Sequence, residues 1–283
     1  LTPGTAINEK FLNEKENNYL LSVVSINNLI GFSLLDHSTG ELLCGETTIS
    51  MLDEMLFKYN VNEILIVEEQ EKDIKNHLPN NVTITLVEDW NADFSSCYNY
   101  LIRHFNLKNL KGFGIESAKH MVVASSLSLK YVDNNSQGRI NHINKIKIIN
   151  EKGHVGLDDF TIKNLELFTS LQNQGIHGTL IGTIDKTKTS FGSRLLKNWI
   201  RMPITDVNDI NTRLNRIQDL LEDFDSCRQA MIHLREIHDI ERILARITSG
   251  KSNPKELLNL AISLRKIDEI EKIFNKEKKY IFK

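Results

Sequence analysis

The sequence is poor in cysteine and has no long apolar run. Its three cysteines, Cys44, Cys97 and Cys227, lie far apart and form no Cys-x-x-Cys pair. This spacing indicates free, buried thiols in a reducing cytoplasm. Apolar stretches such as residues 19–26 end after about eight positions, short of the ~18–20 that a membrane span needs. No signal peptide is recognisable, so we expect a cytoplasmic protein that does not enter a membrane.

The sequence also lacks a nucleophile motif and an initial methionine. No serine, cysteine or histidine lies in a recognisable nucleophile motif, which favours a scaffold or interaction role over an enzyme. The chain of 283 residues begins with Leu1 rather than methionine, so we expect a piece of a longer protein. With 40% hydrophobic and 25% charged residues, the composition is that of a globular protein with about two domains.

Charge is divided unevenly along the chain. Residues 1–133 carry 10 Lys and Arg against 18 Asp and Glu, a net charge of −8, whereas residues 134–283 carry 25 against 19, a net charge of +6. The acidic first half is a poor surface for phosphate groups. The mildly basic second half leaves a duplex-DNA-binding module open as an alternative function, although a solvated face is the simpler interpretation.

The first half has an α/β pattern. Three strands separated by Asn27-Asn28 and by a turn at residues 37–40 should form an antiparallel meander, at residues 17–26, 29–36 and 41–48. Further strands are predicted at residues 63–68 and 82–87, and helices at residues 50–59, 93–106 and 116–132. The polar stretch 133–141 marks the predicted domain boundary. Residues 142–150 are expected to form a strand or an extended link.

The second half is helical from about residue 158. A helix at 191–201 ends before Pro203, and Thr205 or Asp206 caps the next helix, 207–222. The first of these helices should face the core through its apolar stripe, Leu195, Leu196, Trp199 and Ile200. Its opposite, solvated face carries Arg194, Lys197, Asn198 and Arg201, which leaves a DNA-reading helix as an alternative. Two more helices are predicted at about residues 228–248 and 254–276.

Residues 245–252, Ala-Arg-Ile-Thr-Ser-Gly-Lys-Ser, fit a loose phosphate-loop pattern, but their context contradicts an ATP site. A phosphate loop follows a strand and wraps the phosphates with glycines. Here the preceding apolar residues repeat at helical spacing, and Asn253-Pro254 starts another helix. We predict an ordinary helix–turn–helix junction with Gly250 in the left-handed cap.

Two other candidate sites fail on geometry. His233 and His238 are five residues apart on a predicted helix, about 140° around it, so they cannot share a zinc ion as i, i+4 ligands do. Asp36, Glu41 and Glu116 suggest a two-metal nuclease, which needs three or four converging carboxylates. Asp36 instead lies in a turn, where aspartate commonly caps backbone N–H groups. We therefore expect no catalytic, metal or cofactor site.

Several stretches, in chain order, resemble the MutS family of DNA mismatch repair proteins. They are residues 1–5 (LTPGT), 31–42 (GFSLLDHSTGEL), 110–117 (LKGFGIES), 164–171, 178–206 and 239–257. The last two stretches are long and specific, and the resemblance covers nearly the whole chain.

The resemblance implies an α/β, RNase H-like connector domain at residues 1–133 and the first part of an all-α core or lever domain at residues 134–283. The family's mismatch-reading, clamp and ATPase domains, with their ATP and Mg²⁺, would lie outside this chain. The implied role is non-catalytic coupling of mismatched-DNA binding to an ATP-driven conformational change. The complete protein would be a homodimer, bacterial and nucleoid-associated, whereas this piece is expected to be monomeric or weakly associated.

The resemblance also implies that the connector domain docks MutL. The helix at residues 93–106 matches the family's partner-contacting helix, and its predicted outward positions are Ser96, Asn99, Tyr100 and Arg103. An exposed tyrosine beside asparagine and arginine suits an interface, because Tyr and Arg are favoured anchors. A solvated helix face is the alternative interpretation.

Overall fold

The structure is a computed structural model that describes residues 2–6, 12–26, 29–79, 82–136, 139–149 and 153–275. The chain divides into two compact units. The first unit comprises Leu1–Asn150 with Leu244–Lys251, and the second comprises Glu151–Ile243 with Ser252–Lys283. Among the described residues, no helix combines the length and apolarity that crossing a bilayer requires. The predicted Asn27-Asn28 turn lies outside the described residues.

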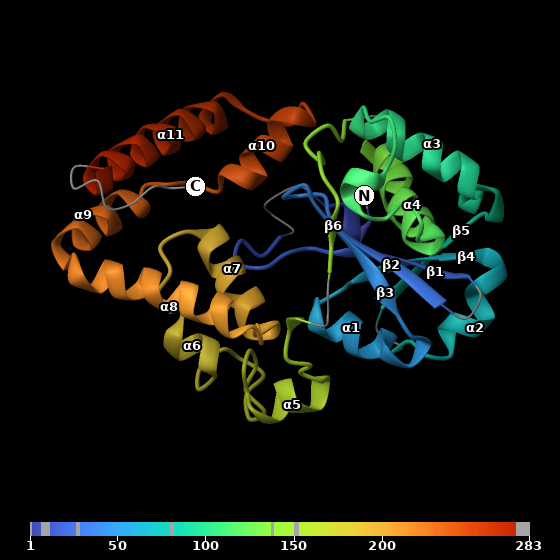
Figure 1. Cartoon of the computed structure of the whole chain (residues 1–283), viewed down its shortest axis with the longest axis horizontal. Coiled ribbons are helices and arrows are strands. Elements are labelled where there is room, and N and C mark those ends of the chain that lie inside the picture. Colours follow the sequence, from blue (N-terminus) through green and yellow to red (C-terminus); the bar gives the residue numbers. More distant parts are fainter. Residues whose placement is uncertain are drawn as a thin grey trace. The chain divides into compact units, whose positions relative to one another are not determined.

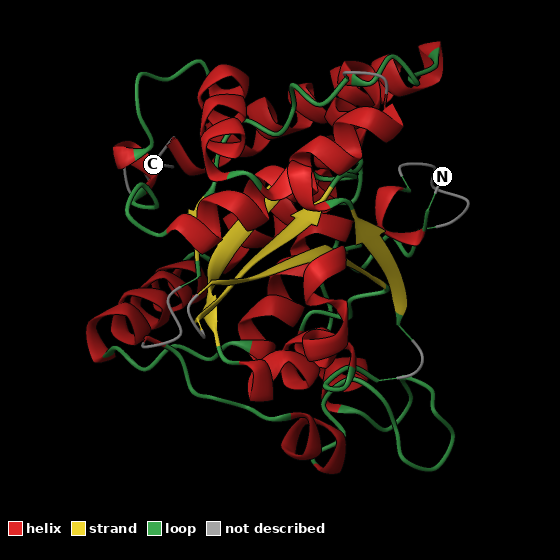
Figure 2. Cartoon of the chain, turned by 90° about the vertical axis from the view of Figure 1, so that its right-hand side faces the viewer, coloured by secondary structure: helices red, strands yellow, loops and turns green. Residues whose placement is uncertain are grey.

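A mixed sheet forms the centre of the first unit, with the strand order β5-β4-β1-β2-β3-β6 (Figures 1 and 2). Its strands are β1 (Leu20–Ile26), β2 (Leu29–Asp36), β3 (Glu41–Thr47), β4 (Glu63–Val67), β5 (Thr83–Val87) and β6 (Lys147–Ile148). β1, β2 and β3 pair antiparallel, whereas β4 pairs parallel with β1 and β5 pairs parallel with β4. The predicted meander and both later strands are therefore confirmed.

Helices cover both faces of this sheet (Figure 1). α4 (Lys119–Ser136) packs on β1, β2 and β3, and α3 (Phe94–Phe105) packs on α4. α4 can approach closely because β2 has a glycine beneath it. A Cβ atom at Gly31 would lie 2.4 Å from the carbonyl carbon of His120. α1 (Leu52–Lys58) lies on the opposite face, and α2 (Glu71–Lys75) follows β4 in the chain.

Two buried carboxylates organise the chain around this sheet. Asp36 accepts hydrogen bonds from the amide of Ser38 at 2.9 Å and from the amide of Asn18 at 3.2 Å, so its predicted role as a turn cap is confirmed. Glu63, fully buried, accepts from the Gly4 amide at 2.8 Å. Its other oxygen accepts from the Thr85 hydroxyl at 2.9 Å and the Tyr131 hydroxyl at 2.8 Å. Because all these donors are satisfied by one acid, Glu63 ties residues 2–6, β5 and α4 together.

The second unit is helical. Its helices are α5 (Asp159–Asn164), α6 (Leu180–Ile184), α7 (Ser190–Arg201), α8 (Val207–Glu222), α9 (Phe224–Leu234), α10 (Ile240–Thr248) and α11 (Pro254–Asn275), with α10 from Leu244 onward counted in the first unit. Asp206 caps α8 by accepting from the amides of Asn208 and Asp209 at 2.8 and 3.0 Å, as the sequence predicts. α9 packs against α11.

The junction after α10 has the predicted helix–turn–helix form. Gly250 has a φ of +66°, and its amide donates to the carbonyl of Ile247 at 3.0 Å. Pro254 opens α11, and Asn253 caps it: its side-chain oxygen accepts from the Glu256 amide at 3.0 Å, while the Glu256 carboxylate accepts from the Asn253 amide at 2.9 Å. This reciprocal pair is a capping box, so residues 245–252 end one helix and lead into the next.

The predicted single helix at about 228–248 is wrong, because α9 and α10 are separate helices. Asp239 marks the break: its carboxylate accepts from the Arg242 amide, in the first turn of α10, at 3.4 Å. The His238 amide also leaves the helical pattern and donates to the Ser263 hydroxyl at 3.0 Å. His233 lies on α9, where its Nδ1 is 2.9 Å from Oε2 of Glu269.

The predicted orientation of α7 is also wrong. Arg194 and Lys197, expected in solvent, are buried, whereas Leu195 and Trp199 are 51% and 42% exposed. Arg194 is buried because Asp239 and Glu241 surround its guanidinium group. The exposed Trp199 ring stacks with Arg213, whose guanidinium carbon is 4.1 Å from the ring centroid. The two buried cations are therefore not available as a DNA-reading face.

Candidate partner-docking surface

The candidate docking surface lies on α3, which has well-defined ends. The Asp93 side chain accepts from the Ser96 amide at 2.8 Å, so it caps the first turn. Asn106 follows the last turn in the left-handed conformation, with a φ of +53°. Cys97 and Leu101 are fully buried on the inner side of the helix. The sequence thus fixes both the length of α3 and the face that it buries.

Three of the four predicted residues form the exposed side of α3. Ser96, Asn99 and Arg103 are exposed, and Arg103 Nε donates to the Asn99 carbonyl at 3.4 Å. Ser96 and Asn99 are three residues apart and Arg103 is a further four along, so all three share one face of the helix. We call these three residues the α3 face.

Tyr100 is half-buried rather than exposed. Its hydroxyl donates to Asp133 Oδ2 at 2.8 Å, and its ring packs at the edge of the apolar core between α3 and α4. Burial, followed by the hydrogen bond and the charge of Asp133, raises the pKa of Tyr100 well above its ordinary value. Tyr100 therefore holds α3 on α4, and its role in docking a partner stays a prediction.

A lysine on α4 completes the attachment. Lys130 Nζ donates to the Asn91 carbonyl at 3.2 Å and to the Ser96 hydroxyl at 3.3 Å, and it lies 5.8 Å from the centre of the Tyr100 ring. Lys130 and Asp133 were not predicted from the sequence. Their spacing of three residues along one helix places both on the same side of α4, which was the available signal.

The acids that suggested a nuclease bind separate partners. Asp36 caps its turn, Glu41 Oε2 accepts from the Tyr19 hydroxyl at 2.7 Å, and Glu116 Oε1 accepts from the Tyr98 hydroxyl at 3.2 Å. Within the described ranges, no group of three or more His, Cys, Asp and Glu side chains could hold a metal ion.

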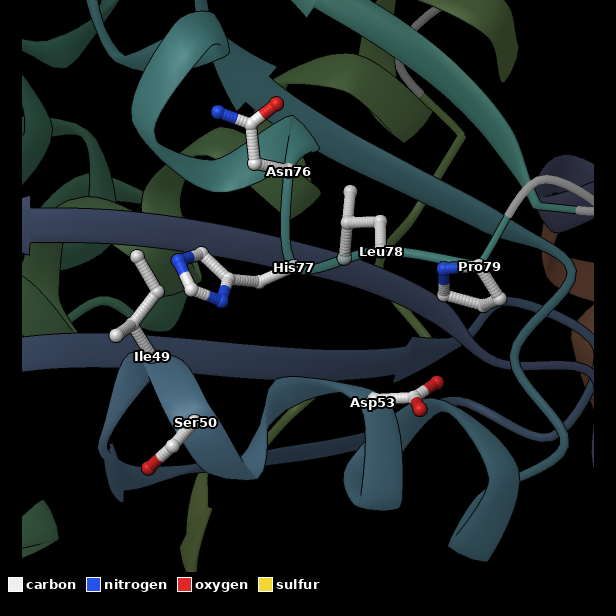
Figure 3. A pocket seen from close by; sticks show the side chains of 7 residues that line it. All are labelled: Ile49, Ser50, Asp53, Asn76, His77, Leu78 and Pro79. Carbon is white, nitrogen blue, oxygen red and sulfur yellow. The ribbon is translucent and has the colours of Figure 1, made fainter.

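A surface hollow of about 320 Å³ lies on another part of the first unit (Figure 3). Ile49 and Ser50, just before α1, and Asp53, in its first turn, line one side, and the segment from Asn76 to Pro79, after α2, lines the other. His77 and Asp53 are its titratable groups. The hollow brings together none of the residues predicted to dock a partner.

Two family models match the two halves of the chain. The model of MutS domain II matches residues 18–144, and the model of MutS domain III matches residues 160–282. The chain therefore belongs to the MutS family of DNA mismatch repair proteins.

Curated relatives match almost the whole chain. The DNA mismatch repair protein MutS of Parabacteroides distasonis is 34% identical over 271 residues, which cover 96% of this chain and 31% of that protein. The MutS proteins of Cytophaga hutchinsonii and Halothermothrix orenii are 30% and 31% identical and cover 99% and 100% of this chain. This chain spans about a third of the length of these relatives.

Proposed function

We propose that this chain is the non-catalytic connector and core segment through which a MutS protein couples mismatched-DNA binding to an ATP-driven change of conformation. In this proposal the first unit is the connector, RNase H-like in fold, and the second is the first part of the core. The chain itself needs no cofactor. ATP and Mg²⁺ would act in other domains of the complete, homodimeric protein.

We further propose that the connector docks MutL through the α3 face. The observation that carries this is the attachment of α3 to α4, in which Tyr100, Asp133 and Lys130 hold the helix while Ser96, Asn99 and Arg103 remain exposed. A rigid, polar face loses little conformational entropy when a partner binds, which favours docking.

Calorimetric titration of this chain with the ATPase domain of MutL tests the proposal. We expect saturable binding that Arg103→Glu weakens roughly tenfold, because a like charge would replace a complementary one. Lys255→Glu makes the same charge change on an exposed position of α11 and should leave the affinity unchanged. Absence of binding, or equal loss in both variants, would count against docking through the α3 face.

The same preparation tests the alternative of a duplex-DNA-binding module. That function requires affinity for duplex DNA that falls steeply with salt, because phosphate contacts release counterions. The burial of Arg194 and Lys197 leads us to expect weak binding at most.

A further inference from the structure

The outer side of β5 is an unprotected sheet edge. Among the described residues, β5 pairs with β4 alone (Figure 1). The Thr83 amide donates to the Asn62 carbonyl, just before β4, at 3.2 Å. Backbone groups of alternate residues point to opposite sides of a strand, so those of Ile84 and Leu86 point away from the sheet. β5 therefore presents the row of donors and acceptors that another strand could pair with.

The two edges of the sheet differ in their protection. Proteins usually shield an edge by shortening the strand or by placing lysine or proline on it. β6 at the other edge has both features, because it has two residues and begins with Lys147. β5 reads Thr-Ile-Thr-Leu-Val, without charge or proline, and its Leu86 is 42% exposed. An unprotected edge of this kind indicates a surface that pairs with another chain.

An exposed tryptophan lies directly beyond β5. Trp90 belongs to the short helix η5 (Asp89–Ala92) and is 71% exposed. Its indole N–H donates to Glu88 Oε2 at 2.5 Å, which orients the ring. Tryptophan is among the residues most enriched at the energetic centres of interfaces. Trp90 follows the end of β5 by three residues and faces solvent, so it is a ready anchor for a partner that pairs with β5.

The charge around this edge identifies the kind of partner. Residues 68–93 contain seven Asp and Glu against two Lys, a net charge of −5, and one of these lysines, Lys75, pairs with Glu71. β4 and β5 end side by side, and the Glu69 amide donates to Asp89 Oδ1 at 3.0 Å, so the acids after the two strands lie together. Two copies of this chain would repel each other at this edge. A basic segment would be attracted, and its lysine or arginine could stack on Trp90.

We propose that the β5 edge and Trp90 bind an extended, basic segment of a partner protein, which adds to the sheet as a strand beside β5. Backbone hydrogen bonds to Ile84 and Leu86 supply the pairing. The acids that follow β4 and β5, Glu68, Glu69, Glu88 and Asp89, supply the preference for positive charge. This surface is distinct from the α3 face, so the two proposals stand or fall separately.

Nuclear magnetic resonance with defined peptides tests this proposal without MutL. The probe is a blocked peptide of alternating lysine and valine, added to the isotope-labelled chain. We expect saturable shifts at Thr83–Val87 and the Trp90 indole, slower hydrogen exchange at the Ile84 and Leu86 amides, and affinity that falls with salt. Trp90→Ala should weaken binding about tenfold, whereas Trp199→Ala, at an exposed tryptophan of the second unit, should not change it.

Peptide controls separate strand addition from simple charge attraction. A peptide N-methylated on alternate residues keeps its charge but cannot pair along one edge, so it should not bind. A peptide of alternating glutamate and valine should not bind either. Equal binding of the methylated peptide, shifts that map to other elements, or protection of Ile84 and Leu86 by self-association without peptide would each overturn the proposal.

Discussion

The ion pair of Arg194 gives the sharpest prediction about the second unit. The Arg194 guanidinium, with 3% of its side chain exposed, donates to both oxygens of Asp239 at 2.6 and 2.9 Å. It also contacts Glu241 Oε2 at 2.5 Å. Burial lowers the pKa of Arg194, but the hydrogen bonds and charges of Asp239 and Glu241 outweigh it and raise the pKa overall. The pair fixes α7 to the start of α10.

Arg194→Met should cost about 3 kcal/mol of unfolding free energy. Removal of one partner from a buried ion pair typically costs 3–5 kcal/mol, because the other charge stays behind without compensation. The lower end applies here because Arg242 Nε, 3.9 Å from Asp239 Oδ2, would still offset part of that charge. Glu241 adds less than about 1 kcal/mol, because its side chain is 53% exposed and screened by solvent.

Urea unfolding followed by tryptophan fluorescence measures this loss. The chain has two tryptophans, Trp90 in the first unit and Trp199 in the second, so a Trp90→Phe background reports on the second unit alone. Arg216→Met, at an exposed arginine of α8, is the matched control and should stay within about 0.5 kcal/mol of the parent. If Arg194→Met cost no more than this control, the buried pair would not stabilise the unit and the reasoning would fail.

A double variant separates the pair from the packing around it. An apolar replacement of both partners of a buried pair is often neutral, because no charge is left behind. Arg194→Met with Asp239→Leu should therefore lose less than the sum of the two single changes, by 1 kcal/mol or more. Additive losses would show that the two side chains contribute independently.

Three further predictions concern the first unit. Glu63→Gln should cost about 1–3 kcal/mol, measured by urea unfolding with Trp90 as reporter, because an amide cannot accept all the hydrogen bonds that reach this carboxylate. Gly250→Ala should lower the melting temperature, because an L-residue at a φ of +66° costs about 1–2 kcal/mol. The new Cβ atom would also lie 2.6 Å from Arg139 Nη1. An unchanged melting temperature would contradict this prediction. The pKa of buried His37 is lowered from 6.5 to about 3, first by burial and then by His142. Between pH 6.5 and about 3, His37 is protonated in the unfolded chain but neutral in the folded chain. The free energy of unfolding therefore falls as the pH falls, by at most about 1.4 kcal/mol per pH unit. His37→Phe should make this slope shallower in urea unfolding at a series of pH values.

Most of the helices and strands could be predicted from the sequence, because residues within a few positions determine where each one begins and ends. β2 and α8 have the predicted bounds, 29–36 and 207–222, since the turn residues that flank β2 and the helical spacing and Asp206 cap of α8 all act within a few residues. The turn at Gly250 was equally readable from Ser-Gly-Lys-Ser-Asn-Pro. The short helices α2, α5 and α6 were missed, because five or six residues give too little periodicity to recognise.

Contacts distant in sequence produced the errors. Apolar spacing assigned Arg194 to solvent, but its partners lie 45 and 47 residues later, beyond the reach of any helical pattern. Helical spacing also predicts an exposed Tyr100, because its partner Asp133 lies 33 residues away. The residues of the α3 face without such long-range partners, Asn99 and Arg103, were placed correctly in solvent.

The net charge of the first unit does not show which of its charged side chains are buried and which are exposed. Asp36 and Glu63 are fully buried and serve as internal acceptors, so they contribute nothing to the surface. Most of the exposed acids follow β4 and β5, whereas the α3 face carries Arg103 and no acid. The two proposed surfaces therefore favour partners of opposite charge, a basic strand at the β5 edge and an acidic or polar patch at the α3 face. One partner could engage both only if it carried both features, so competition between a basic peptide and MutL would show whether the surfaces serve one partner or two.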